Sequence, residues 1–395
     1  MKFLFLTNPA YGHLNPVLGI ITELVKKKHH VVVYNTEEFA EIIKKTGAEC
    51  RLPPFSVGEF DTRKMNSALN IAEKILEITE IAVPPLTKII QEEKFDCLFH
   101  DAMGLWGKLA AYRTKTPAVS LISSMAINKN VLLRYTKYLI SDYLKEIIQP
   151  MRTLKILHSC NKIYKEMDNA NDSIIDLFVN KEKLNLVFTS KYFQPISESF
   201  DPSFKFVGPI IFDRKEQAIP EKLLQTKKPK IYISLGTAFN DNIDLYKMLI
   251  KSISNSSYQI FLSIGNFIKP TDLGKIPDNI YISAYLPQLE ILKEADLFIS
   301  HGGMNSVNES LYFGVPMLLF PIIQEQRINA SRVEELGAGI YYKQRIKGEE
   351  ELITLTNKIL SNNYYKKNAL KIGQTLVKTG GLQTAVDHIL AFVKG

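Results

Sequence analysis

Residues 285–326 read YLPQLEILKEADLFISHGGMNSVNESLYFGVPMLLFPIIQEQ, and this stretch is decisive for the fold. It predicts a strand at 295–300, a glycine turn at 301–303, a helix that begins near Asn305, and a second strand at 314–321. Polar groups stand only where a strand ends and a loop begins. A glycine turn that leads into a helix presents backbone N–H groups and the positive end of the helix dipole. The stretch therefore predicts an anion site, suited to phosphate, in an alternating α/β unit.

A long ordered pattern in this stretch resembles the nucleotide-sugar signature of the UDP-glycosyltransferase superfamily. The residues that carry it are Pro287-Gln288, His301-Gly302-Gly303-x-Asn305-Ser306-x-x-Glu309, Gly314-Val315-Pro316 and Pro321-x-x-x-Glu325-Gln326. Chain length and layout resemble the bacterial macrolide-type branch, which glycosylates small natural products. The resemblance runs from the first strand to the last helix and is weak only between residues 125 and 200. It implies a GT-B fold, in which two Rossmann-like parallel-sheet domains face each other across a cleft.

The hydrophobic pattern divides the chain into two series of alternating strands and helices, which favours parallel sheets. The first series begins with a strand at 2–7 and a helix for which Pro16 marks the first position, and it ends at 204–211. The second begins at 230–237, after a charged segment with two prolines. Together with the resemblance, this predicts an acceptor-binding domain at 1–212, a linker at 213–229, a UDP-sugar-binding domain at 230–379, and a helix at 380–395 that packs back on the N-terminal domain.

Composition limits the possible classes of function. Hydrophobic residues make up 46% of the chain, yet no apolar run approaches the roughly 18–20 residues of a membrane span. The N-terminus leads into a motif rather than a cleavage site, so we expect a cytoplasmic protein, as a monomer or homodimer. The net charge of +8 comes from scattered lysines, which indicates a solvated surface or a basic cleft for an anionic donor, and no nucleic-acid motif accompanies it. The isolated cysteines Cys50, Cys97 and Cys160 predict structural thiols rather than disulfides or a metal site.

Two residues are candidates for acid–base chemistry. His13 follows the first strand, and Asp101 follows the strand at 95–99 after one residue, His100. Ligands of parallel sheets bind at the carboxyl ends of strands, so the two side chains are placed to meet there. From the residues alone, His13 also fits a loop histidine and Asp101 a helix N-cap, while His100 has no assigned role. The Gly-His-x-x-Pro motif of the family implies that His13 deprotonates the acceptor and that Asp101 orients its ring.

The resemblance also implies residues that contact the phosphates. Thr237, at the end of SLGT, would bind the β-phosphate, although it also fits a helix start. His301 would face the diphosphate as a neutral or charged hydrogen-bond donor, beside the turn at Gly303. Asn305 and Ser306 would bind the α-phosphate. No metal ion is expected, because the sequence holds no Asp-x-Asp motif.

The remaining signature residues would hold the nucleoside and the sugar. Glu309 has two interpretations: its S-x-x-E spacing fits a capping box, whereas the family places this glutamate on the ribose hydroxyls. Tyr285, at a position where tryptophan is common in the family, would stack on uracil, and Gln288 would contact the base or the ribose edge. Glu325 and Gln326 match the acidic-Gln pair that holds hexose hydroxyls.

The predicted function is that of an inverting glycosyltransferase that needs no cofactor beyond its UDP-sugar co-substrate. It would move a hexose, with UDP-glucose favoured, to a hydroxyl of a small hydrophobic acceptor such as a macrolide, a flavonoid or another phenol. The acceptor pocket is expected within residues 125–200. The apolar side chains there fit a pocket lining or a core: Leu132, Leu133, Tyr135, Tyr138, Leu139, Tyr143 and Phe178.

Three other functions fit parts of the sequence. A lipid glycosyltransferase of the same fold would use basic and apolar helices of the N-terminal half at a membrane surface, without stable insertion. A non-catalytic UDP-sugar-binding protein would have no need of His13 and Asp101. A UDP-sugar epimerase of similar architecture would lack the Gly-His-x-x-Pro start, which this chain has.

The missing Asp-x-Asp motif leads to a prediction about metal ions. We expect sugar transfer to persist in EDTA, because side chains and a helix N-terminus replace the metal at the diphosphate. Mass spectrometry of the product, with a UDP-sugar and a phenolic acceptor, measures the transfer. An activity that EDTA abolishes and Mg²⁺ restores would contradict the prediction.

Overall fold

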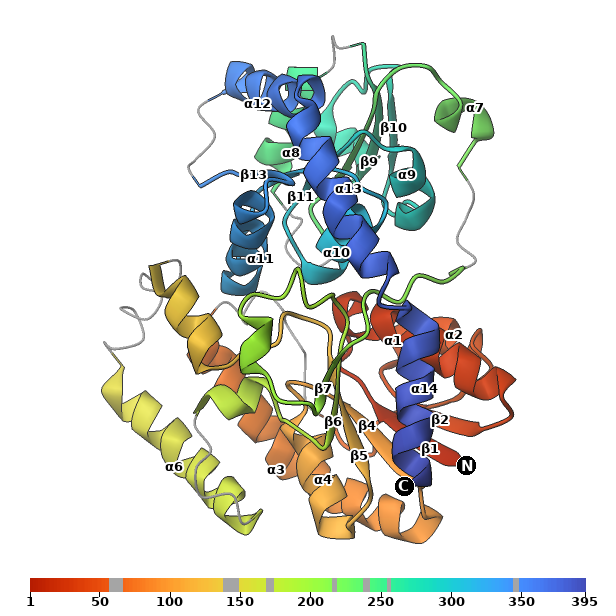
Figure 1. The fold of residues 1–395 in the computed structure, drawn as a ribbon, viewed down its shortest axis with the longest axis vertical. Helices are drawn as coiled ribbons and strands as arrows, with labels where there is room; N and C mark the ends of the chain where they lie inside the picture. The colour runs from red at the N-terminus through yellow and green to blue at the C-terminus, as the bar shows by residue number, and fades with distance from the viewer. Residues whose placement is uncertain are drawn as a thin grey trace. The chain divides into compact units, whose positions relative to one another are not determined.

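A computed structural model of the chain describes residues 1–56, 67–137, 149–167, 174–214, 219–236, 242–253, 257–343 and 348–395. The chain forms two compact units (Figure 1). Unit 1 comprises Met1–Ile211 together with Thr379–Gly395, and unit 2 comprises Phe212–Lys378. Among the described residues, no helix has the length and the apolar character needed to cross a membrane.

Unit 1 is built on a seven-stranded parallel sheet with the strand order β3-β2-β1-β4-β5-β6-β7. The strands are β1 (Lys2–Leu6), β2 (His30–Tyr34), β3 (Glu49–Arg51), β4 (Cys97–Asp101), β5 (Ala118–Ile122), β6 (Leu184–Val187) and β7 (Phe204–Phe206). Phe3, Leu4 and Phe5 are completely buried. Since neighbouring side chains of a strand point to opposite faces, both faces of this sheet are covered, which explains the unbroken apolar runs.

Helices connect the strands of unit 1 and cover the sheet. They are α1 (Tyr11–Lys26), α2 (Glu37–Lys44), α3 (Ala68–Glu93), α4 (Leu105–Thr114), α6 (Pro150–Glu166) and α14 (Gly381–Lys394), with 3₁₀ turns η2 (Ile174–Phe178) and η3 (Ser197–Ser199). Helix α14 comes from the end of the chain and lies along α1 (Figure 1). The last helix therefore belongs to the first unit.

The start of α1 differs from the prediction that Pro16 is the first helical residue. The helix begins at Tyr11, with Ala10 as its N-cap, so Pro16 lies inside it. A proline near the start of a helix removes one backbone hydrogen bond, and the helix tolerates this loss more easily there than in its middle. The earlier start places His13 in the first helical turn.

Unit 2 is built on a six-stranded parallel sheet with the order β10-β9-β8-β11-β12-β13. The strands are β8 (Lys230–Ser234), β9 (Gln259–Ser263), β10 (Ile280–Ser283), β11 (Leu297–Ser300), β12 (Met317–Leu319) and β13 (Gly339–Tyr341). The helices are α7 (Glu221–Leu224), α8 (Ile243–Ile253), α9 (Gln288–Glu294), α10 (Met304–Tyr312), α11 (Gln324–Glu335), α12 (Glu349–Ser361) and α13 (Asn363–Val377), with the 3₁₀ turn η4 (Pro270–Leu273). The prediction of an α/β fold with two parallel sheets is confirmed.

The apolar residues expected near the acceptor lie in several environments. Tyr135 is completely buried, and Phe178 packs against the core of unit 1. Leu133 is exposed and Leu132 is half-buried. Tyr138, Leu139 and Tyr143 lie outside the described residues. Tyr135 therefore belongs to the core, whereas Leu132, Leu133 and the partly buried Phe178 present apolar surface.

Gly373 allows α13 to approach α10 closely in unit 2. A Cβ at this position would lie 2.3 Å from the main-chain oxygen of Leu311, at the end of α10. We expect Gly373→Ala to destabilise the protein by about 1–3 kcal/mol, because the two helix backbones must move apart. Denaturant unfolding measures the loss, and Lys367→Ala on the exposed side of α13 is the control. Equal stability of the two variants would contradict this account of the helix contact.

Candidate active site

Sheet topology brings His13 and Asp101 together in unit 1. Strands β1 and β4 are neighbours, with Leu6 opposite His100, and the chain order of the sheet reverses between them. At such a reversal, the loops that follow the two strands leave in opposite directions and leave a crevice at their carboxyl ends. His13 Nδ1 lies 2.5 Å from Asp101 Oδ2. The two residues predicted to meet at this edge of the sheet are therefore hydrogen-bonded.

The Asp101 carboxylate is held on both of its oxygens. Oδ1 accepts hydrogen bonds from the main-chain N–H of Met103 (2.8 Å) and from Asn8 Nδ2 (3.2 Å), and Oδ2 faces His13. The side chain is 4% exposed, so these partners replace its water. Helix α4 has Gly104 as its N-cap. The alternative in which Asp101 is an ordinary N-cap is therefore wrong.

The arrangement decides which His13 nitrogen can act as a base. A carboxylate only accepts hydrogen bonds, so Nδ1 carries the proton of the neutral ring and Nε2 is left with its lone pair. The ring is 28% exposed, which leaves it open to a reactant. Ser123 Oγ, which follows β5, lies 3.2 Å from the same Nδ1. Sequence reasoning missed Asn8 and Ser123, whose only signal is that each lies within two residues of the end of a strand of this sheet.

His100 lies directly behind Asp101 and is completely buried. Its Nδ1 is 2.9 Å from the main-chain oxygen of Asp101, and its Nε2 is 3.2 Å from Glu182 Oε1. Both ring nitrogens therefore face acceptors. The ring links Asp101, the last residue of β4, to Glu182, which lies shortly before β6. These two contacts fix the backbone that carries Asp101.

In unit 2, His301 lies between two glycine backbones at the end of β11. A Cβ on Gly236 or Gly303 would lie within 2.7 or 2.6 Å of its Nε2. Burial lowers the pKa of His301 from 6.5 to about 4, and a hydrogen bond with the Ser234 main chain opposes the shift only in part. The ring is therefore neutral near pH 7.

Helix α10 begins immediately after this turn. Its N-cap is Gly303, and no side chain of the described residues caps it. Asn305 and Ser306 lie in its first turn, where the helix dipole favours an anion. The capping-box interpretation of Glu309 is wrong, because that motif requires Ser306 to be the N-cap. Glu309 is 4% exposed and instead accepts hydrogen bonds from Arg214 and from Gln288 Nε2.

Helix α11 carries the acidic-Gln pair. The Gln326 amide oxygen accepts hydrogen bonds from the N–H groups of Ile322 (2.8 Å) and Ile323 (3.3 Å), so it caps the helix and leaves the amide nitrogen as the donor group. Asn329 on the same helix donates to the main-chain oxygen of Gly302 (2.9 Å) and lies 3.5 Å from Glu325 Oε1. The amide of Asn329 thus joins the helix to the glycine turn.

Tyr285 and Thr237 are the remaining residues predicted to bind the sugar donor. Tyr285 follows β10 and is 48% exposed. Thr237 lies outside the described residues.

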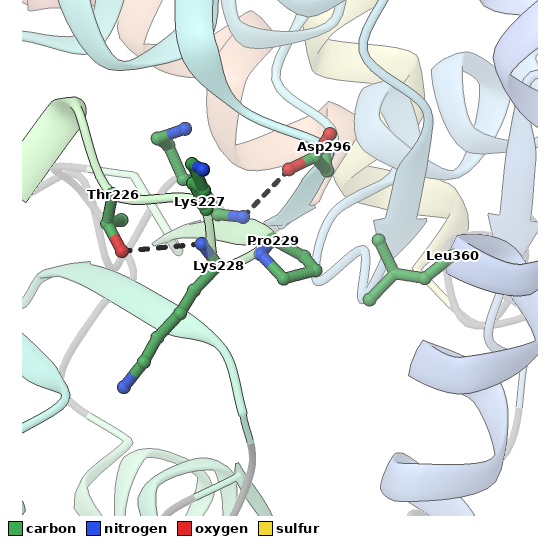
Figure 2. A pocket seen from close by; sticks show the side chains of 7 residues that line it. Thr226, Lys227, Lys228, Pro229, Asp296 and Leu360 are labelled. Atoms are coloured by element: carbon green, nitrogen blue, oxygen red, sulfur yellow. Dashed lines mark hydrogen bonds between the residues drawn. The ribbon is translucent and has the colours of Figure 1, made fainter.

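A hollow of about 390 Å³ lies at the opposite end of the unit 2 sheet (Figure 2). Lysines 227, 228 and 230 line it, and the main-chain N–H of Lys230 donates to Asp296 (2.8 Å). Lys230 begins β8, whereas His301 follows the carboxyl end of the adjacent strand β11. None of the predicted site residues lines this hollow.

Comparison with known proteins identifies relatives along the whole chain. The family model for UDP-glucoronosyl and UDP-glucosyl transferase matches residues 81–378. NDP-glycosyltransferase YjiC of Bacillus subtilis (strain 168) is 35% identical over 98% of this chain and 96% of its own length. Oleandomycin glycosyltransferase of Streptomyces antibioticus is 26% identical over 97% of this chain and 88% of its own length.

Solved structures show the same fold. The glycotransferase of kitacinnamycin superposes with a TM-score of 0.85 and 22% identity, covering 99% of both chains. The calicheamicin glycosyltransferase CalG4 superposes with a TM-score of 0.81 and 24% identity, covering 100% of this chain and 98% of its own. Both support the GT-B fold that the sequence predicts.

The partly buried His301, neutral near pH 7, predicts a dependence of stability on pH. Its pKa is lower in the folded protein than in the unfolded chain, so its contribution is present above pH 6.5 and is lost as the pH falls toward 4. Between pH 7 and pH 4.5 we expect wild type to lose about 2–3 kcal/mol more than His301→Gln. Denaturant unfolding followed by circular dichroism compares the two proteins. An identical pH dependence would show that folding does not lower the pKa of His301.

Proposed function

The chain belongs to the UDP-glucoronosyl and UDP-glucosyl transferase family, and from this membership we propose that it is an inverting enzyme that transfers glucose from UDP-glucose. The acceptor is a hydroxyl of a small natural product, such as a macrolide, a flavonoid or another phenol. The name of the oleandomycin glycosyltransferase among its relatives supports this class of acceptor. We also propose that the enzyme works in the cytoplasm, as a monomer or homodimer.

The hydrogen bond between His13 and Asp101 carries the proposal. His13 Nε2 takes the proton of the acceptor hydroxyl, and the Asp101 carboxylate, 2.5 Å from Nδ1, stabilises the imidazolium that forms. The acceptor oxygen forms a bond with the anomeric carbon while the bond from that carbon to the diphosphate oxygen breaks. The bonding electrons leave with UDP. Attack opposite to the leaving group converts an α-linked donor into a β-glycoside.

The groups of unit 2 suit a UDP-sugar. The proposed diphosphate contacts are the neutral His301 ring, the first turn of α10 with Gly303, Asn305 and Ser306, and Thr237. A neutral imidazole donates a hydrogen bond without adding a charge that must be removed from water. The proposed contacts to the nucleoside and the hexose are Tyr285, Gln288, Glu309, Glu325 and Gln326. Residues 1–212 would thus serve the acceptor and residues 230–379 the donor.

The role of His13 can be tested by its removal. We expect His13→Ala to lower turnover on an alcohol acceptor roughly 10²–10⁴-fold, because no other group takes the proton. Affinity for UDP should not change, since the proposed nucleotide contacts all lie in unit 2. Mass spectrometry measures turnover and calorimetry measures UDP binding. His30→Ala, at the amino end of β2, is the control and should retain wild-type values of both.

The choice of acceptor makes this test specific for proton transfer. A phenol or a thiol loses its proton more easily than an alcohol, so its transfer should suffer least in the His13 variant. Near-normal rates of His13→Ala on an alcohol would show that the base lies elsewhere.

A further inference from the structure

Arg214 and Glu309 form a deeply buried ion pair in unit 2. Arg214 Nη2 donates to Glu309 Oε1, and the two side chains are 6% and 5% exposed. Of the ion pairs formed by described residues, this pair alone has both side chains less than a tenth exposed. The pair between Arg113 and Glu166, by comparison, is 38% and 40% exposed. Among these pairs, the Arg214–Glu309 pair is thus the least accessible to water.

The carboxylate of Glu309 is fixed from both sides. Gln288 Nε2 donates to Oε2 at 2.6 Å, so each oxygen has one donor. A carboxylate offers about four acceptor positions, two on each oxygen, and one therefore remains on each. Because the two donors approach different oxygens, the group cannot rotate, and the remaining acceptor positions keep fixed directions. Arg214 also makes a cation–π contact with Phe212, with 5.9 Å between the guanidinium carbon and the ring centroid.

The burial of this pair needs a reason beyond stability. Two charges withdrawn from water gain little net free energy over apolar residues of similar size, so a buried pair is weak evidence of a purely structural role. Two vicinal hydroxyl groups can each donate one hydrogen bond to the two acceptor positions that remain on this fixed carboxylate. Hydrogen bonds from hydroxyl groups to an ionised acceptor are stronger than those to a neutral one.

We propose that Arg214 is a positioning residue of the nucleoside site, which together with Gln288 holds the Glu309 carboxylate so that it accepts the vicinal hydroxyls of a ribose. This inference rests on the proposed function, from which the contact between Glu309 and ribose is taken. The new element is Arg214, which lies 95 residues before Glu309 and outside the signature. Arg214 does not touch the nucleotide. It acts through Glu309 and thereby makes the site select ribonucleotides over 2′-deoxyribonucleotides.

The ratio of affinities for UDP and 2′-deoxy-UDP tests this role, because the two ligands differ by one hydroxyl. Calorimetry on the full chain should show that the affinity of wild type for UDP is at least roughly tenfold higher than its affinity for 2′-deoxy-UDP. In Arg214→Gln the ratio should fall toward one, mainly through weaker UDP binding, because a neutral amide no longer holds the carboxylate. Arg214→Lys, which keeps the charge without the planar fork, should recover part of the ratio.

Two further variants distinguish positioning from general damage. In a Glu309→Gln background, Arg214→Gln should cause no further change in the ratio, since both act on one contact. Arg332→Gln, which removes a more exposed pair with Glu335 in the same unit, should leave the ratio at the wild-type value. If the role of Arg214 were merely structural, Arg214→Gln would weaken the binding of both ligands equally and would leave the ratio of affinities unchanged.

The outcomes separate this inference from the proposed function. Wild type that binds no UDP would overturn the proposed function and this inference together. Wild type that discriminates while a folded Arg214→Gln discriminates equally well would overturn the inference and leave the function intact. If Arg214→Gln does not fold, Arg214→Lys decides: a severalfold smaller ratio supports the role of Arg214, and an unchanged ratio overturns it.

Discussion

The pairing of β1 with β4 in unit 1, and of β8 with β11 in unit 2, is the constraint on which the arrangement of the predicted site residues within each unit depends. In each sheet the chain order reverses between these two neighbours. Leu6 lies opposite His100 and Ser300 lies opposite Ser234, so segments far apart in sequence emerge side by side at the carboxyl edge. His13 meets Asp101 in unit 1 for this reason. His301 lies against the Gly236 backbone in unit 2 for the same reason.

Buried polar groups at these edges have defined partners that compensate for the water they lose. Asp101 receives N–H groups from Met103 and Asn8, and Glu309 receives donors from Arg214 and Gln288. Such groups cost free energy unless they are hydrogen-bonded, and each bond also restricts the direction of the side chain. The strands supply rigid positions, and the hydrogen bonds supply orientation. The combination matches what a site needs in order to hold reacting groups in place.

Sequence reasoning succeeded where the information is local. Apolar runs and glycine turns predict the strands of both sheets, and the order of the signature residues predicts the family. It failed at helix starts: Pro16 misplaced the start of α1, and the S-x-x-E spacing suggested a cap that Gly303 supplies instead. It also missed Asn8, Ser123 and Arg214, whose partners lie 93, 110 and 95 residues away. No local pattern marks such residues, because the packed fold alone creates their contacts.

The two histidines illustrate how environment assigns chemical roles. His13 is partly exposed and its Nδ1 lies against a carboxylate, which stabilises the ring when it gains a charge. His301 is enclosed by glycine backbone, and its partners among the described residues are the neutral groups of Ser300 and Ser234. A general base must become charged during the reaction, whereas a phosphate ligand can act without any change of charge. With its pKa lowered to about 4, His301 would resist protonation by a hydroxyl, which agrees with the proposal that His13 is the base and that His301 binds the diphosphate.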